Sequence, residues 1–190
     1  MGTSGTRAPA AAVATAGVVA VAALVGRSGP SSGTGPEALW AAALGTWAAG
    51  VVLLGVVDVQ RRVLPTRLVH LTALASGSLV LAASAVAGHW QYLWRGCALA
   101  LAAVLVFAAW YLASPGKLGF GDVRMAALVS AGTGAVCPAG CLVVLPCACL
   151  VTALSRKVLI KTGRASGDYA APLGLPLAIA GVLAVVASAS

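Results

Sequence analysis

Two aspartates carry the chemistry that this sequence suggests. The acidic residues of the chain are Glu37, Asp58, Asp122 and Asp168. Only Asp58 and Asp122 directly border long hydrophobic segments. Two neighbouring carboxylates cannot both ionise cheaply, so they share a proton, and such a pair can hold a water molecule between a base and an acid. The two residues are therefore candidates for the acid–base hydrolysis of a peptide bond.

Glycines precede the second aspartate in the run Gly119-Phe120-Gly121-Asp122-Val123-Arg124-Met125. Glycine at 119 and 121 lets the backbone turn tightly and lets another segment approach closely, as a carboxylate placed against a peptide substrate requires. In the alternative interpretation, Asp122 caps its helix and Asp58 pairs with Arg61 or Arg62. The two glycines favour the catalytic interpretation.

The composition requires a membrane around these residues. The chain is 61% hydrophobic and 8% charged, whereas about 25% of the residues of a soluble domain are charged. Its 190 residues have room for about six to eight spans of about 20 residues each and for no separate soluble domain, so we expect a single domain over residues 1–190. The net charge of +8 comes from basic residues in short loops. This pattern indicates membrane topology and contact with anionic lipid, not with nucleic acid.

We expect an all-α, polytopic transmembrane bundle of about seven spans. They run roughly over residues 9–25, 38–57, 68–87, 96–113, 122–133, 135–154 and 172–188. Spans that lack period-2 polar alternation close their backbone hydrogen bonds as helices, not as a barrel. The fifth span is short, and Gly132-Thr133-Gly134 marks either a turn after it or a break within one longer hairpin. Pro138 and Pro146 are candidate kinks in the sixth span.

The N-terminal region has two interpretations. Arg7 followed by an Ala/Val run is also typical of a signal peptide, so the first span is either retained or cleaved. The stretch 26–37 is rich in Ser, Gly and Pro, which predicts a flexible linker outside the cytoplasm.

Charge in the loops predicts the orientation. If the spans alternate, ten of the 12 Lys and Arg residues lie on one side, and only Arg27 and Arg95 lie on the other. Lys and Arg in short loops mark the cytoplasmic face. The N-terminus and both aspartates are therefore expected at the cytoplasmic edge of the inner (plasma) membrane, where water can reach the carboxylates. On the opposite side, we expect an aromatic belt in a loop, made of His89, Trp90, Tyr92 and Trp94.

Together, these motifs resemble those of the prepilin peptidase family, membrane aspartic peptidases of the GxGD class. The resemblance runs from about residue 40 to 185. Asp58 with Arg61-Arg62-Val63-Leu64-Pro65 resembles the first aspartate of the family. The run 119–125 resembles the second, where the family usually has Lys in place of Arg124. Pro172-Leu173-Gly174-Leu175-Pro176 resembles the Pro-Phe-Gly-Pro opening of the last helix, with one extra residue.

The resemblance implies an aspartic-type endopeptidase of type IV pilus or protein secretion systems, with no cofactor and no metal. Its substrate would be a prepilin or pseudopilin, whose short basic leader is cut at the cytoplasmic membrane face. The catalytic residues would be Asp58 and Asp122. The supporting motif residues would be Gly119, Gly121, Arg124, Pro65, Pro172 and Gly174. The cysteines fall in predicted spans without Cys-x-x-Cys spacing, so the chain resembles the short members, which lack the N-terminal cysteine-motif and methyltransferase domain.

Helix ends suggest how the pair divides its roles. Asp122 opens a helix, where an anion is stabilised, and Asp58 closes one, so we expect Asp122 as the base and Asp58 as the acid. Two other functions remain open. A presenilin or signal-peptide-peptidase type of protease expects Tyr where Val57 stands and Pro-Ala-Leu where Pro172-Leu173-Gly174 stands. A non-enzymatic transporter or assembly subunit would use the aspartates to relay protons.

Overall fold

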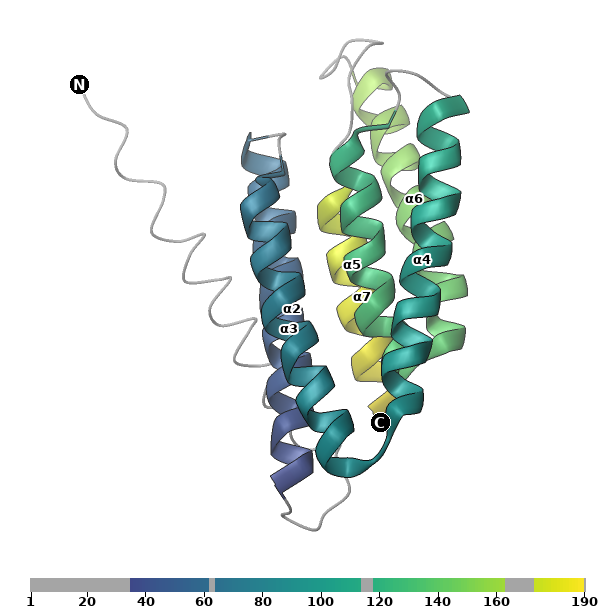
Figure 1. The fold of residues 1–190 in the computed structure, drawn as a ribbon. Helices are drawn as coiled ribbons and strands as arrows, with labels where there is room; N and C mark the ends of the chain where they lie inside the picture. The colour runs from purple at the N-terminus through teal and green to yellow at the C-terminus, as the bar shows by residue number, and fades with distance from the viewer. Residues whose placement is uncertain (1–34, 62–63, 114–117, 163–172, 190) are drawn as a thin grey trace, which may run out of the picture.

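The computed structural model describes residues 35–61, 64–113, 118–162 and 173–189, which form helices and, within these ranges, no strand (Figure 1). The helices are α2 (Gly35–Arg61), α3 (Thr66–Ala87), α4 (Trp90–Ala113), α5 (Phe120–Val136), α6 (Pro138–Lys161) and α7 (Gly174–Ala189). The prediction of an all-helical bundle is confirmed. These helices correspond to the second through seventh predicted spans, and the first, at 9–25, lies outside the described residues.

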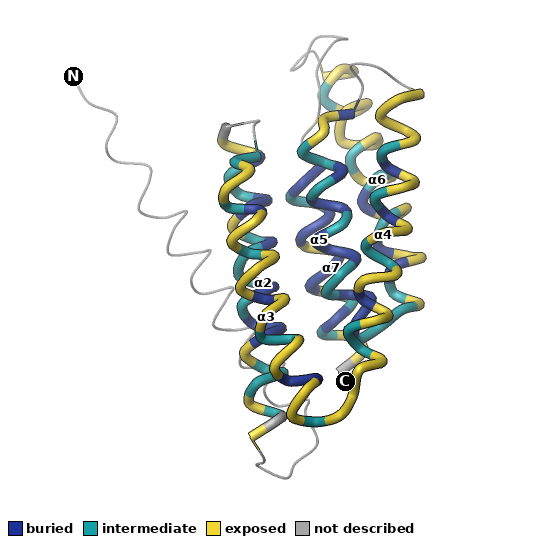
Figure 2. Tube along the Cα trace, viewed as in Figure 1, coloured by how far each residue is buried: buried dark blue, intermediate teal, exposed yellow. Residues whose placement is uncertain are grey.

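The helices run side by side, with α5 and α7 in the middle, α2 and α3 on one side and α4 and α6 on the other (Figure 1). The middle of the bundle is the most buried part (Figure 2). Its core includes Val51 and Leu54 from α2, Met125 and Val129 from α5, and Leu177 from α7, all fully buried. α3 packs mainly on α2, and α4 packs mainly on α5. The bundle therefore consists of an α2–α3 pair and an α4–α7 group, joined chiefly where α2 meets α7.

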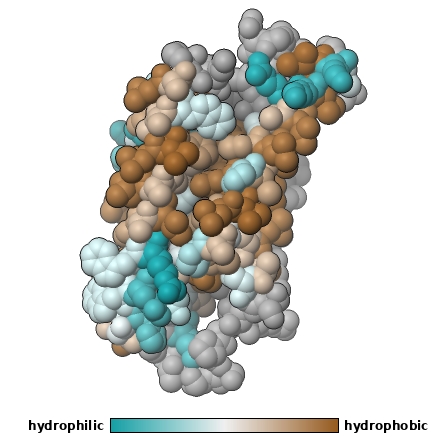
Figure 3. Space-filling view, turned by 90° about the vertical axis from the view of Figure 1, so that its right-hand side faces the viewer, coloured by the Kyte–Doolittle hydropathy of each residue, from teal (hydrophilic) through white to brown (hydrophobic). Residues whose placement is uncertain are grey.

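The outside of the bundle suits a membrane. Among the described helices, four are long and apolar enough to cross one: Glu37–Gln60 of α2, together with α3, α4 and α6. α7 is apolar but shorter, and α5 has 17 residues. Leu71, Leu74, Leu101, Leu105 and Leu142 are each at least 60% exposed. The face made by α4 and α6 is hydrophobic over its middle, with hydrophilic side chains toward its two ends (Figure 3). The chain is thus a helical membrane protein.

The turn between the fifth and sixth spans lies later than we expected. Residues 132–134 are helical in α5, and the chain turns at Cys137. Pro138 begins α6, where its missing N–H interrupts no helical hydrogen bond. The predicted turn at Gly132 and the predicted kink at Pro138 were therefore wrong. Pro146 lies inside α6.

Trp47 explains why glycine stands in the middle of α5. A Cβ atom at Gly132 would meet the indole ring of Trp47, and the indole Nε1–H donates a buried hydrogen bond of 2.8 Å to the Leu128 carbonyl oxygen. Gly132 therefore makes room for an aromatic anchor between α2 and α5. A glycine in this sequence signals helix packing here, not a turn.

Two predicted loop regions also become helix. Trp90, Tyr92 and Trp94 belong to the first turns of α4, not to a loop, and the Tyr92 ring packs on Trp40 of α2 with 5.0 Å between the ring centroids. Gly35 and Glu37, at the end of the predicted linker 26–37, start α2. Pro36 is compatible with this start, because the first turn of a helix has no use for its N–H.

Candidate functional site

Asp58 lies on the last turns of α2 and is 7% exposed. The backbone N–H of Gly174, the first residue of α7, donates to its Oδ2 at 3.0 Å. The first N–H groups of a helix have no partner within that helix. Asp58 therefore caps a helix that lies 116 residues further along the chain. A Cβ atom at Gly174 would lie 2.7 Å from Asp58 Oδ2, so the contact requires glycine.

Asp122 lies in the first turn of α5. Its Oδ2 accepts a hydrogen bond of 3.0 Å from the N–H of Gly119, and its own N–H donates to the Gly119 carbonyl oxygen at 3.0 Å. Asp122 thus caps its own helix, as the alternative interpretation holds. This role occupies one carboxylate oxygen. No hydrogen bond from a described residue reaches Oδ1 of Asp58 or of Asp122.

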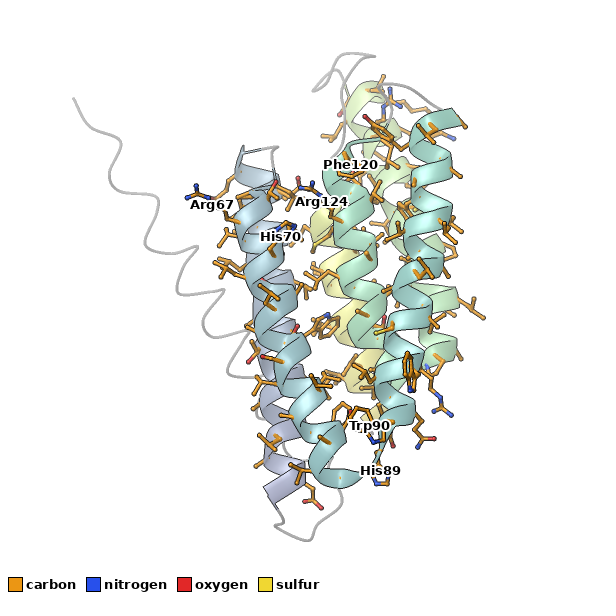
Figure 4. All side chains as sticks on the ribbon, viewed as in Figure 1. Arg67, His70, His89, Trp90, Phe120 and Arg124 are labelled. Atoms are coloured by element: carbon orange, nitrogen blue, oxygen red, sulfur yellow. The ribbon has the colours of Figure 1, made fainter. Side chains whose placement is uncertain are left out.

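The two carboxylates interact across the junction between the α2–α3 pair and the α4–α7 group. The negative charge of Asp58 acts on Asp122. Phe120 and Arg124, which flank Asp122 in the first turns of α5, lie with Arg67 at one end of the bundle, opposite the end where His89 and Trp90 lie (Figure 4). Both carboxylates therefore belong to one candidate site.

The helix ends give no support to the expected division of roles, with Asp122 as the base and Asp58 as the acid. Asp58 closes α2, but its carboxylate also accepts an N–H from the start of α7. An anion at either carboxylate is therefore stabilised by the N-terminus of a helix. The helix dipoles do not distinguish a base from an acid in this pair.

Gly121 brings the connection between α2 and α3 close to Asp122. A Cβ atom at Gly121 would lie 3.0 Å from Leu64 Cδ1 and 3.2 Å from Leu64 Cβ. Among the described glycines, only Gly88 has a positive φ, so Gly121 serves close packing, not an unusual backbone conformation. Pro65 follows Leu64 at the N-cap of α3, where its carbonyl oxygen accepts the N–H of Leu68 at 3.0 Å.

Arg124 also connects α5 to the start of α3. Its Nη1 donates to Thr66 Oγ1 at 2.7 Å, and its guanidinium carbon lies 4.7 Å from the centroid of the Phe120 ring. Of the remaining predicted residues, Gly119 is the N-cap of α5. Pro172, Arg62 and the side chain of Arg61 lie outside the described residues.

Sequence reasoning missed two neighbours of the aspartates. One feature of the sequence pointed to the contact between Asp58 and Gly174. Gly174 and Pro176 open an apolar helix that has no polar capping residue of its own. The second neighbour is Cys149 of α6, one of the cysteines that fall in predicted spans. It lies close enough to Asp122 for the two groups to interact electrostatically. Within the described ranges, no three His, Cys, Asp or Glu side chains gather where they could hold a metal ion.

A comparison with protein-family models, with curated proteins and with solved structures finds no match to this chain. The motifs and the geometry around Asp58 and Asp122 are therefore the basis on which a function can be assigned.

Proposed function

We propose that this protein is a membrane-embedded aspartic endopeptidase that removes the short basic leader peptide of a prepilin or pseudopilin. One observation carries the proposal: Asp58 and Asp122 interact electrostatically, although they come from different helices. Each is held through Oδ2 by a backbone N–H near a helix start. Each keeps Oδ1 for a water molecule or a substrate.

The pair can hydrolyse a peptide bond without a further group. The ionised carboxylate accepts a proton from a water molecule, whose oxygen bonds to the scissile carbonyl carbon. The protonated carboxyl donates its proton to the carbonyl oxygen, which gives a tetrahedral diol. The diol then collapses: the C–N bond breaks, the amine takes a proton from the carboxyl that gained one from water, and a diol hydroxyl returns its proton to the other carboxylate.

The charge at this end of the bundle supports cleavage at the cytoplasmic membrane edge. Arg67 on α3 and Arg124 on α5 lie at the end that holds the aspartates (Figure 4). The last turns of α6 add Arg156, Lys157 and Lys161, which are exposed. Basic residues at one end of a helical bundle favour the cytoplasmic side and attract anionic lipid headgroups. In this arrangement, a substrate anchored by one apolar helix would present its leader at the level of the aspartates.

Co-expression with a candidate prepilin tests the proposal, with leader removal scored as a gel shift. The wild-type chain should cleave, and Asp58→Asn and Asp122→Asn should each abolish cleavage, because each substitution keeps the shape and removes the titrating group. Glu37→Gln is the matched control, because Glu37 lies on the same helix as Asp58 at its other end. Asp168→Asn, in the chain outside the described residues, should also retain most activity.

Near wild-type cleavage by either aspartate variant would contradict the catalytic pair. Cleavage within the apolar helix of a substrate, and not at its leader, would favour the presenilin type of protease. A chain that cleaves no prepilin but conducts protons only while both aspartates are present would favour the transporter.

A further inference from the structure

Three hydrogen bonds between described residues join the α2–α3 pair to the α4–α7 group. Trp47 donates to the Leu128 carbonyl oxygen at 2.8 Å, Gly174 donates to Asp58 at 3.0 Å, and Arg124 donates to Thr66 at 2.7 Å. The two aspartates lie on opposite sides of this junction. Whatever fixes the junction near the site therefore fixes the separation of the two carboxylates.

The three bonds differ in whether they survive catalysis unchanged. The Asp58–Gly174 bond uses a carboxylate whose protonation would change during the reaction. Trp47 precedes Asp58 by 11 residues, which is about 16 Å along a helix. The Trp47–Leu128 bond therefore joins the two helix groups far from the aspartates. Only the Arg124–Thr66 bond lies near the aspartates and involves neither of them.

We propose that Arg124 is a positioning residue, which acts through Thr66 to set the separation of Asp58 and Asp122. This inference rests on the proposed function. Arg124 follows Asp122 by two residues, so it moves with the first turn of α5. Thr66 begins α3, two residues after Leu64, whose side chain packs on Gly121. The bond thus fastens the chain that leaves Asp58 to the turn that carries Asp122.

The surroundings of Arg124 restrict its motion. The Phe120 ring lies next to the guanidinium group, which gains from the cation–π contact and loses rotational freedom. A guanidinium group only donates hydrogen bonds, and the Thr66 hydroxyl oxygen can accept one. A lysine at 124 would keep a donor and a positive charge, whereas methionine would keep only the apolar stem. Valine at 66 keeps the shape of threonine and removes the acceptor.

The test measures leader cleavage by the purified protein in detergent, with the variants Arg124→Met, Thr66→Val and the double variant. Each single variant should lower kcat roughly fivefold with KM unchanged, as expected for loss of one hydrogen bond that orients the reacting groups. The double variant should be no slower than the slower single variant, because both remove the same bond. Arg124→Lys and Thr66→Ser should restore most of the rate. Thr152→Val is the matched control, because the Thr152 hydroxyl bonds only to Ala148 of its own helix, at 2.8 Å.

A second measurement reports the arrangement of the two helix groups and does not depend on catalytic activity. Spin labels at the exposed residues Leu71 on α3 and Leu105 on α4 report the separation of the two helix groups. The distance distribution should broaden in Arg124→Met and Thr66→Val and stay as in the parent protein in Thr152→Val. If the parent protein cleaves no prepilin, the proposed function fails while this readout still tests the positioning.

Two results would overturn the inference. If Thr66→Val turns over like the wild type while Arg124→Met is slow, Arg124 acts on the substrate directly and not through Thr66. If both single variants leave the distance distribution unchanged, the bond does not hold the junction.

Discussion

The N–H of Gly174 donates to the carboxylate of Asp58 at 3.0 Å, across 116 residues of sequence. One contact thereby gives the first N–H of α7 a partner and orients a candidate catalytic side chain. In the same way, the N–H of Gly119 holds Asp122. The two aspartates thus use the same device, a backbone donor on Oδ2, although one donor is distant in sequence and the other is local.

Gly174→Ala should damage activity more than stability. The added methyl carbon would lie 2.7 Å from Asp58 Oδ2, so the carboxylate must move, and a shift of about 1 Å in a reacting group can cost about 100-fold in rate. We expect a loss of roughly tenfold to 100-fold in kcat. Gly77→Ala is the control, because a Cβ atom there would meet nothing within 4 Å. A Gly174→Ala protein as active as Gly77→Ala would show that this bond does not orient Asp58.

Gly121→Ala should also lower the rate of leader cleavage, because the added methyl group would meet Leu64. The new methyl group would press on Leu64 at 3.0 Å and push the α2–α3 connection away from Asp122. Shortening the partner in Gly121→Ala/Leu64→Ala should recover part of the lost rate. If the double variant is as slow as Gly121→Ala, the glycine instead admits the substrate backbone, as the sequence motif alone suggested.

Gly132→Ala should destabilise the protein, although alanine normally favours a helix by up to about 1 kcal/mol over glycine. Its methyl group would meet the Trp47 indole, and overpacking of this kind costs about 1 to 3 kcal/mol. Trp47→Phe should cost about 1 kcal/mol through the lost bond to Leu128. Thermal unfolding in detergent measures both, and Gly77→Ala should match or exceed the wild-type melting temperature. A Gly132→Ala protein as stable as Gly77→Ala would argue against this close contact.

Cysteine labelling tests the orientation. Arg67 and His89 lie at opposite ends of the bundle (Figure 4), and both side chains are exposed. In a background without native cysteines, Arg67→Cys should resist an impermeant thiol reagent in intact cells, whereas His89→Cys should react. The reverse pattern would put the aspartates outside the cytoplasm.

The sequence predicted the helices well because apolar runs in a membrane leave the backbone few alternatives. It failed where glycine and proline have two uses. Gly132 supports close helix packing and Pro138 starts a helix, although both residues also mark turns. The local sequence does not distinguish these uses. Gly132 packs against Trp47, and Trp47 lies far from Gly132 in sequence.

The candidate site was predictable in its members but not in its contacts. Asp58 and Asp122 stand out because charge is rare beside apolar spans. That Asp58 meets the start of α7, or that Arg124 meets Thr66, depends on which helices pack together. The sequence argument about Asp58 considered only the C-terminal end of its own helix, α2. The N-terminus of a second helix, α7, also acts on its carboxylate.

The pairing of Asp58 with Gly174 also determines when a newly made chain can become complete. Ribosomes add about 5 to 20 residues per second, so the 116 residues between the two partners take roughly 6 to 23 s to synthesise. During that time α2 and α5 emerge with both aspartates, while the donor for Asp58 does not yet exist. A fragment that stops before residue 174 would carry every acidic side chain of the site and still lack its arrangement. Synthesis of the helix that begins at Gly174 is thus the step that completes the site.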